Sequence, residues 1–124
     1  MTAFEYAVLR IVPRVDRGEF VNGAVLLYSQ GGEYLGIRVR ADLGCVRALS
    51  PDADVEAIRE ALASAAAVVS GDPAAGEAGH GDPGRRFRWL TAPRSAVIQP
   101  GPVHTGVTDD PAAELERIAA RMLG

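Results

Sequence analysis

Residue types suited to binding an anion gather in one segment, Arg85 to Thr108. This segment holds four of the thirteen arginines, the single Trp and one of the two His, and it contains no Asp or Glu. Arginine guanidinium groups bind carboxylates and phosphates through paired hydrogen bonds. A histidine can exchange a proton near neutral pH. The segment therefore predicts a site for an anionic group.

Three prolines in this segment hold the backbone extended, which would orient the neighbouring side chains before a ligand arrives. Arg94 is the expected centre of the site because it lies between Pro93 and Ser95. His104 is the candidate general acid or base, and no other catalytic residue is predicted. The expected ligand-binding or partner-binding residues are Arg94, Ser95, Gln99, His104, Thr105, Arg88 and Arg10.

The length and composition indicate one ordinary domain. A chain of 124 residues that is 48% hydrophobic can bury a core without disulfides. Cys45 with His80 and His104 falls short of the four ligands of a structural zinc site, so neither a metal nor a cofactor is predicted. The single cysteine, the lack of a signal peptide and the lack of a long apolar run lead us to expect a cytoplasmic protein.

The first third of the chain predicts strands at 4–12, 19–29 and 34–40, which are rich in β-branched and aromatic residues. Short turns separate them, so we expect an antiparallel β-meander. Asn22-Gly23 inside the second strand fits either a hairpin turn or a bulge. Later in the chain, residues 95–99 predict a further strand, while residues 87–90 fit either a strand or a helical turn.

Two helices are predicted from their capping signals. Ser50-Pro51 is expected to start one that ends at Gly71, and Asp110-Pro111 is expected to start the other. Apolar residues at helical spacing define their buried sides. These are Val55, Ile58, Leu62, Ala65 and Val69 in the first, and Leu115, Ile118, Ala119 and Met122 in the second.

The stretch 71–84 contains five Gly and two Pro, and it predicts a flexible surface loop too poor in bulky apolar residues to bury anything. The simplest architecture for residues 1–124 is a single α+β domain. Its antiparallel β-meander sheet would carry the two main helices on one face, with one shared core.

Two blocks of sequence resemble a known family. YAVLRIVPRVDRGEFVNGAVLLYS at 6–29 and FRWLTAPRSAVIQPGPVHTG at 87–106 are similar to the bacterial family catalogued as domain of unknown function 3037. The resemblance implies a small cytoplasmic bacterial protein with no established activity, whose members are often encoded beside a kinase-like protein of the HipA type. The recurring residues of the family, none with an assigned role, fall on Arg10, Pro13, Asn22, Arg94, Ser95, Gln99, His104 and Gly106.

Two main functional hypotheses remain open. The favoured one is an interaction or adaptor module whose basic segment, 85–108, binds an acidic surface on a partner, such as the kinase-like protein. The alternative is a binder of, or enzyme acting on, a small anionic ligand carrying phosphate or carboxylate, with His104 as acid or base. Binding is favoured over catalysis. The net charge of −3 argues against nucleic-acid binding, for which the candidates would be Arg85, Arg86, Arg88 and Trp89. No nucleophile motif supports Cys45 or Ser95 acting with His104.

Overall fold

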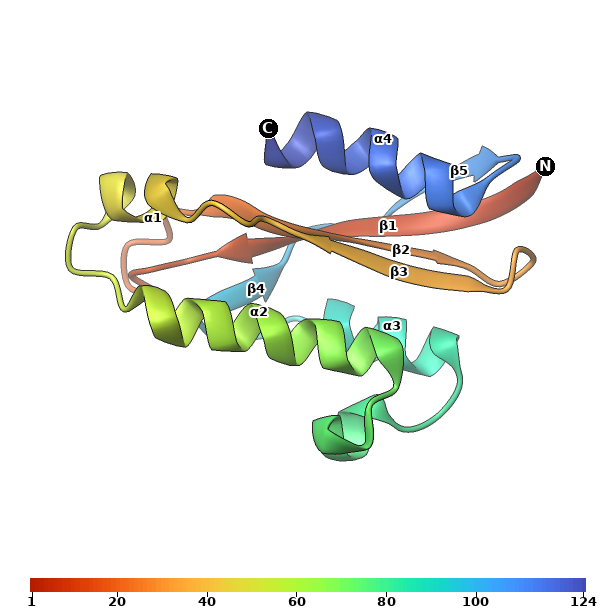
Figure 1. Cartoon of the computed structure of the whole chain (residues 1–124), viewed down its shortest axis with the longest axis horizontal. Helices are drawn as coiled ribbons and strands as arrows, with labels where there is room; N and C mark the ends of the chain where they lie inside the picture. The colour runs from red at the N-terminus through yellow and green to blue at the C-terminus, as the bar shows by residue number, and fades with distance from the viewer.

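Five strands form one antiparallel sheet in the computed structural model, which describes residues 1–124 (Figure 1). The strands are β1 (Thr2–Ile11), β2 (Val21–Ser29), β3 (Tyr34–Val39), β4 (Ile98–Pro100) and β5 (His104–Thr108). The order β3-β2-β1 is the predicted meander, and β4 and β5 both pair with the other edge of β1. The α+β class and the antiparallel sheet are therefore confirmed.

Strand β1 is the centre of the sheet, and its pairing fixes which side chains share a face. Tyr6 pairs with His104 and Arg10 pairs with Gln99. On the other side of β1, Leu9 pairs with Ala24 and Arg10 pairs with Asn22, so Gly23 between them has no partner in β1. Of the two alternatives for Asn22-Gly23, the structure therefore contains the bulge.

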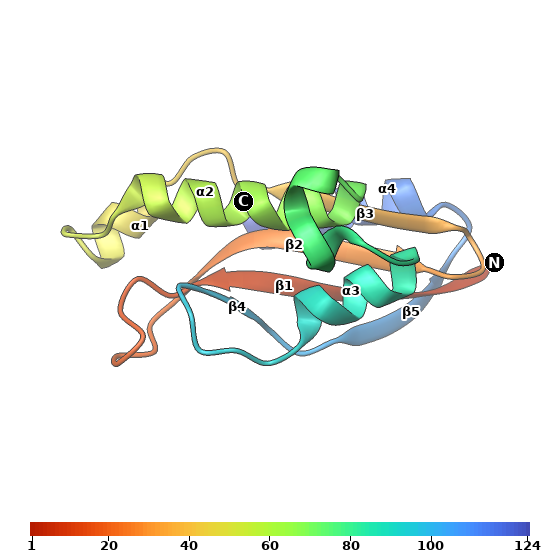
Figure 2. The same cartoon turned by 90° about the horizontal axis from the view of Figure 1, so that it is seen from below.

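Helices cover both faces of the sheet, not one face as the sequence led us to expect (Figures 1 and 2). They are α1 (Gly44–Leu49), α2 (Val55–Ser70), the 3₁₀ helix η1 (Pro73–Gly79), α3 (Pro83–Thr91) and α4 (Pro111–Leu123). Helix α4 packs over β2 and β3 on one face, and α2 and α3 lie on the opposite face. None of these helices is both long and apolar enough to cross a membrane.

The apolar interior is divided into two clusters by the sheet, so the expectation of one shared core is also wrong. Leu62 of α2 belongs to the larger cluster, with Leu9 of β1. Ile118 of α4 belongs to the smaller cluster, with Leu27 of β2. Strands β1 and β2 are apolar on both alternating sides, and each side requires a helix to cover it.

Helix α2 begins four residues later than the predicted start at Pro51. The carboxylate of Asp54 accepts a hydrogen bond from the Ala57 N–H at 3.1 Å and caps the helix there. Ser50 instead ends the short helix α1, which the sequence did not predict. The predicted end is confirmed, because Gly71 caps α2 with a left-handed φ of 69°.

The segment 71–84 contains η1 and the beginning of α3. Ala75 and Ala78 of η1 pack against the larger cluster, and Gly79 is buried. The expectation that this segment buries nothing is therefore wrong. Small side chains suffice here because η1 packs directly against α2. Its flexibility remains a prediction.

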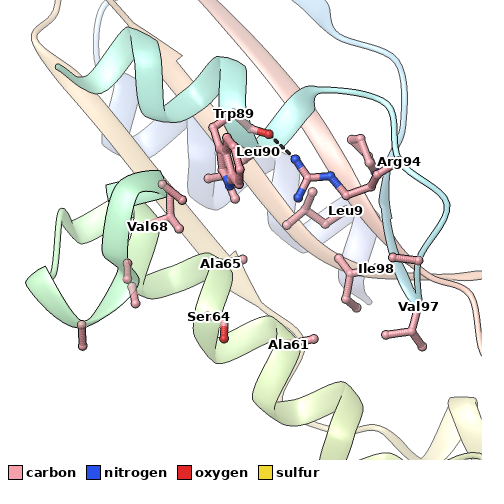
Figure 3. Close-up of a pocket in the computed structure, with 16 residues that line it drawn as sticks. Leu9, Ala61, Ser64, Ala65, Val68, Trp89, Leu90, Arg94, Val97 and Ile98 are labelled. Atoms are coloured by element: carbon pink, nitrogen blue, oxygen red, sulfur yellow. Dashed lines mark hydrogen bonds between the residues drawn. The ribbon is translucent and has the colours of Figure 1, made fainter. Parts of the chain in front are cut away.

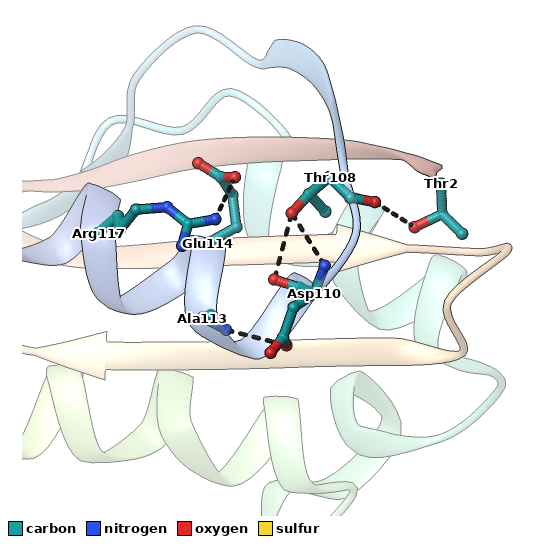
Figure 4. A network of polar contacts seen from close by, with 6 residues as sticks. All are labelled: Thr2, Thr108, Asp110, Ala113, Glu114 and Arg117. Atoms are coloured by element: carbon teal, nitrogen blue, oxygen red, sulfur yellow. Dashed lines mark hydrogen bonds and ion pairs between the residues drawn. The ribbon is translucent and has the colours of Figure 1, made fainter.

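A set of polar contacts fixes the start of α4 beside the end of β5 (Figure 4). The buried Thr108 hydroxyl accepts a hydrogen bond from the Asp110 N–H at 3.1 Å. The Asp110 carboxylate accepts one from the Ala113 N–H at 3.2 Å, which confirms the predicted cap. One turn later, Arg117 donates to Glu114 at 2.8 Å and lowers the pKa of that carboxyl.

Replacing Asp110 by Ala should lower the free energy of unfolding by about 1 kcal/mol, because an orphan N–H at the start of α4 loses its partner. Asp109→Ala is the matched control. The only ion pair of the Asp109 carboxylate is with the chain's amino group at 3.5 Å, and both groups are exposed. Urea denaturation of both variants measures the difference. An equal loss in the two variants would contradict the capping role.

Candidate functional site

Helix α3 positions the first half of the basic segment, and residues 87–90 are helical. The carboxylate of Asp82 caps the helix by accepting from the Arg85 N–H at 2.8 Å, and a proline follows the cap. Phe87 and Leu90 face the core, while Trp89 is 50% exposed. The helix thus divides the segment into an apolar inner side and a cationic, aromatic outer side.

Two arginines of α3 are bound to other parts of the chain. Arg86 donates to the carbonyl of Gly81 at 2.7 Å and to the carbonyl of Val69 at 3.3 Å, so it ties α3 to the end of α2. Arg88 forms an ion pair of 2.7 Å with Glu5 of β1. Both guanidinium groups therefore stabilise the fold as well as carrying charge.

Arg94 lies in the turn that follows α3 and folds back toward the helix (Figure 3). Its guanidinium donates to the carbonyl of Trp89 and, at 3.3 Å, to the carbonyl of Ala92. It also lies 5.5 Å from the centre of the Trp89 ring. The side chain is exposed, but these contacts hold it in one place.

Beside Arg94 and Trp89 lies a cavity of about 470 Å³ between α2, η1, the end of α3 and β4 (Figure 3). Thirteen of its sixteen lining residues are hydrophobic. The lining residues are Leu9, Ala61, Ser64, Ala65, Ala67, Val68, Ala74, Ala75, Ala78, Trp89, Leu90, Arg94, Ala96, Val97, Ile98 and Pro100. Arg94 is the only one with a formal charge.

The opposite face of the sheet carries three other predicted residues. Cross-strand partners share a face, so Arg10 and Gln99 lie together, as do Tyr6 and His104. Tyr6 packs against the cluster under α4, which identifies this as the α4 face. His104 therefore lies on the far side of the sheet from Arg94.

Ser95 lies on the same side as Arg94, whereas Thr105 belongs to neither of these groups. Ser95 is exposed in the turn next to Arg94, and it makes no side-chain hydrogen bond within the chain. Thr105 pairs with Glu5 and lines a surface hollow with Arg88. The structure thus distributes the predicted residues over three places, and it does not place His104 where it could exchange a proton with a ligand at Arg94.

Sequence reasoning missed the walls of the cavity. The available signal was the accumulation of small residues in α2 and η1, which read ALASAAAVVS at 61–70 and PAAGEAG at 73–79. Small side chains on two adjoining helices leave space that larger ones would fill. No group of three or more His, Cys, Asp or Glu side chains is arranged to hold a metal ion.

Comparison with known proteins identifies the family of the chain. No curated protein matches it, and no solved structure matches it. The family described as Protein of unknown function (DUF3037) matches residues 6–123, nearly the whole chain. The resemblance seen in the two sequence blocks is therefore confirmed, and the chain belongs to this family.

Proposed function

We propose that this protein binds a small ligand with an apolar body and one anionic end, a carboxylate or a phosphate, in the cavity beside Arg94. The observation that carries the proposal is the combination of an apolar cavity of about 470 Å³ with a single charged group. Cavities that bind small molecules are mostly apolar, have volumes of about 300–1,000 Å³ and contain a few placed polar groups.

The apolar lining of the cavity favours a ligand whose body is apolar. Ala61, Val68 and Ile98 contribute side chains from α2 and β4 that cannot hydrogen-bond. Transfer of apolar surface from water into such a cavity contributes about 25 cal/mol per Å². A strongly polar body would lose its hydration without gaining partners, so an alkyl or aryl body fits this cavity best.

Arg94 is the residue that would bind the anionic end of the ligand. Its contacts with Trp89 and Ala92 use two of the five N–H donors of a guanidinium. The other donors are available to a carboxylate or phosphate. Because the side chain is already held in place, little conformational entropy is lost when an anion binds.

Trp89 gives a direct optical test because it is the only Trp in the chain and it lines the cavity. Its fluorescence should change on titration with octanoate or octyl phosphate. The uncharged 1-octanol, which has the same alkyl length, should bind about tenfold more weakly or worse, because it lacks the charge-assisted hydrogen bond. Equal affinity for octanoate and 1-octanol would contradict the role of Arg94.

Arg94→Gln should weaken octanoate binding by about 10- to 100-fold, which is the effect of losing a hydrogen bond to a charged group. Arg85→Gln is the matched control, because Arg85 is an exposed arginine of the same segment and makes no side-chain hydrogen bond within the chain. It should bind octanoate like the unsubstituted protein. Parallel losses in both variants would show that only the general charge of the segment matters.

A second candidate is the docking of an acidic partner surface on the outer side of α3. It is favoured by the exposure of Arg85, Arg88 and the half-exposed Trp89 on that side. Arginine and tryptophan are common anchors of protein interfaces. The kinase-like protein implied by the family resemblance is the partner to test. Its capture by the unsubstituted protein and not by Arg85→Gln would favour this candidate.

A further inference from the structure

A second surface, on the opposite side of the sheet from the cavity, has its own combination of rings and cations. Helix α4 packs over β2 and β3 and leaves side chains of β1, β4 and β5 on the same face partly or fully exposed. We call this surface the sheet-face patch. It consists of Tyr6, Arg10, Phe20, Gln99 and His104.

Two rings pack against each other at one end of the patch. Tyr6 of β1 and His104 of β5 are cross-strand partners, and their ring centres are 5.0 Å apart with a tilt of 31°. His104 is exposed and Tyr6 is half-buried. Tyr6 covers one side of the His104 ring, so the ring surface on which a planar ligand can stack is the exposed side of His104.

Arg10 lies at the other end of the patch and makes no hydrogen bond or ion pair with its side chain. Its guanidinium carbon is 4.2 Å from the centre of the Phe20 ring. On its other side is the backbone of Gly101, where a Cβ atom would lie only 3.2 Å from Nε of Arg10. The absence of a side chain at Gly101 therefore lets the guanidinium lie over the backbone that links β4 to β5.

Carboxylates are absent from this face of the outer strands. Strands β4 and β5 contain none, and the only one in β1, that of Glu5, lies on the other face and pairs with Arg88. A half-buried guanidinium usually has a hydrogen-bond partner, as Arg40 and Arg86 do in this chain. The half-buried Arg10 has none within the chain, so its charge is available to a bound anion.

The separation of the rings and the guanidinium along β1 follows approximately from strand geometry. The N–H of Gly101 donates to the carbonyl of Val8 at 2.8 Å, so the guanidinium over Gly101 lies at the level of Val8. Val8 and Tyr6 are two residues apart on one strand face, or about 7 Å. This separation is comparable to that between the base and the 5′-phosphate of one nucleotide.

From this arrangement we propose that the sheet-face patch is a binding site for a nucleoside monophosphate. The base stacks on the exposed side of the His104 ring, which packs on Tyr6, and the phosphate accepts hydrogen bonds from Arg10. The patch offers one ring pair and one unpaired guanidinium, which suits one nucleotide. A single strand would need a row of phosphate contacts, and the net charge of −3 disfavours a polyanion.

The proposal is tested with the full chain labelled with ¹⁵N, titrated with adenosine 5′-monophosphate, adenosine, ribose 5-phosphate and a hexamer of adenylate. The monophosphate should shift the amide signals of Tyr6, Gly101 and His104, and it should bind at least about tenfold more tightly than either fragment. If ribose 5-phosphate binds as tightly as the monophosphate, the rings play no part. Binding of the hexamer alone, or no shift at the patch, would also overturn the proposal.

Two variants with matched controls separate the contributions of charge and ring. Arg10→Gln and His104→Ala should each weaken binding of the monophosphate by about tenfold. Arg85→Gln and His80→Ala replace exposed residues of the same types outside the patch and should bind normally. Unchanged binding in Arg10→Gln or in His104→Ala would contradict the proposal. The titrations with the four ligands use the unsubstituted protein, so they test the proposal even if a variant folds poorly.

Discussion

Replacing Leu62 and Ile118 by Ala in the same chain is expected to lower the free energy of unfolding by the sum of the two single losses, each about 2–5 kcal/mol. Both side chains are almost fully buried, with exposed fractions of 2% and 1%. They lie in different apolar clusters on opposite faces of the sheet. Substitutions without shared neighbours are additive to within about 0.5 kcal/mol.

Urea denaturation of the two single variants and the double variant measures the sum. Leu62→Ala combined with Ile58→Ala is the matched comparison, because both of those residues belong to the larger cluster and both lie on α2. Coupling is expected in that pair. A coupling energy above about 1 kcal/mol between Leu62 and Ile118 would contradict the division of the interior by the sheet.

Phe87→Ala is expected to lower the free energy of unfolding by about 3–5 kcal/mol. Phe87 is fully buried, and its ring is stacked on Tyr28 of β2 with centres 5.5 Å apart. It attaches α3 to the sheet, so its loss also releases the helix that carries Trp89. The result would show that the basic segment is partly a core element.

Trp89→Ala is the matched control for Phe87, because it removes a larger ring from the same helix at a position that is 50% exposed. Its loss of stability should be much smaller, since exposed apolar groups contribute little to folding. Thermal or chemical denaturation compares the two. A loss for Trp89→Ala equal to that for Phe87→Ala would mean that Trp89 belongs to the core and is not available to a ligand.

The helices and strands that could be predicted were those whose own residues, or the residues next to them, indicate the structure. The meander followed from apolar runs separated by turns, and the start of α4 followed from Asp110-Pro111. The same pair of residues occurs at Asp72-Pro73 and Asp82-Pro83, where it starts η1 and α3. The many glycines of 71–84 hid both starts, because glycine opposes helix formation in isolation, and packing against α2 outweighs that cost.

The two-sided arrangement of helices was not predictable from either helix alone. Each helix has one apolar stripe, which shows that it packs on something but not on which face. The apolar pattern of β1 did contain the information, since its residues are apolar on both alternating sides. A sheet of that kind requires cover on both faces.

The candidate site was only partly predictable because proximity in sequence differs from proximity on a face. His104 and Thr105 are neighbours in the chain, yet successive strand residues point to opposite faces, so they belong to different surfaces. Arg94 was a site candidate because of its neighbouring proline and its charge, and the structure places it beside a cavity, while its role in binding stays a prediction. The cavity was not predictable, because it arises from the absence of large side chains on α2 and η1.

The cavity beside Arg94 is proposed to hold an anionic ligand with an apolar body. The most direct measurement is the set of intermolecular nuclear Overhauser effects between bound octanoate and protein methyl groups. We predict effects from the octanoate chain to Ala61, Val68 and Ile98, and their loss in Arg94→Gln at the same octanoate concentration. Effects to methyl groups outside the cavity, or none at saturating octanoate, would contradict the claim.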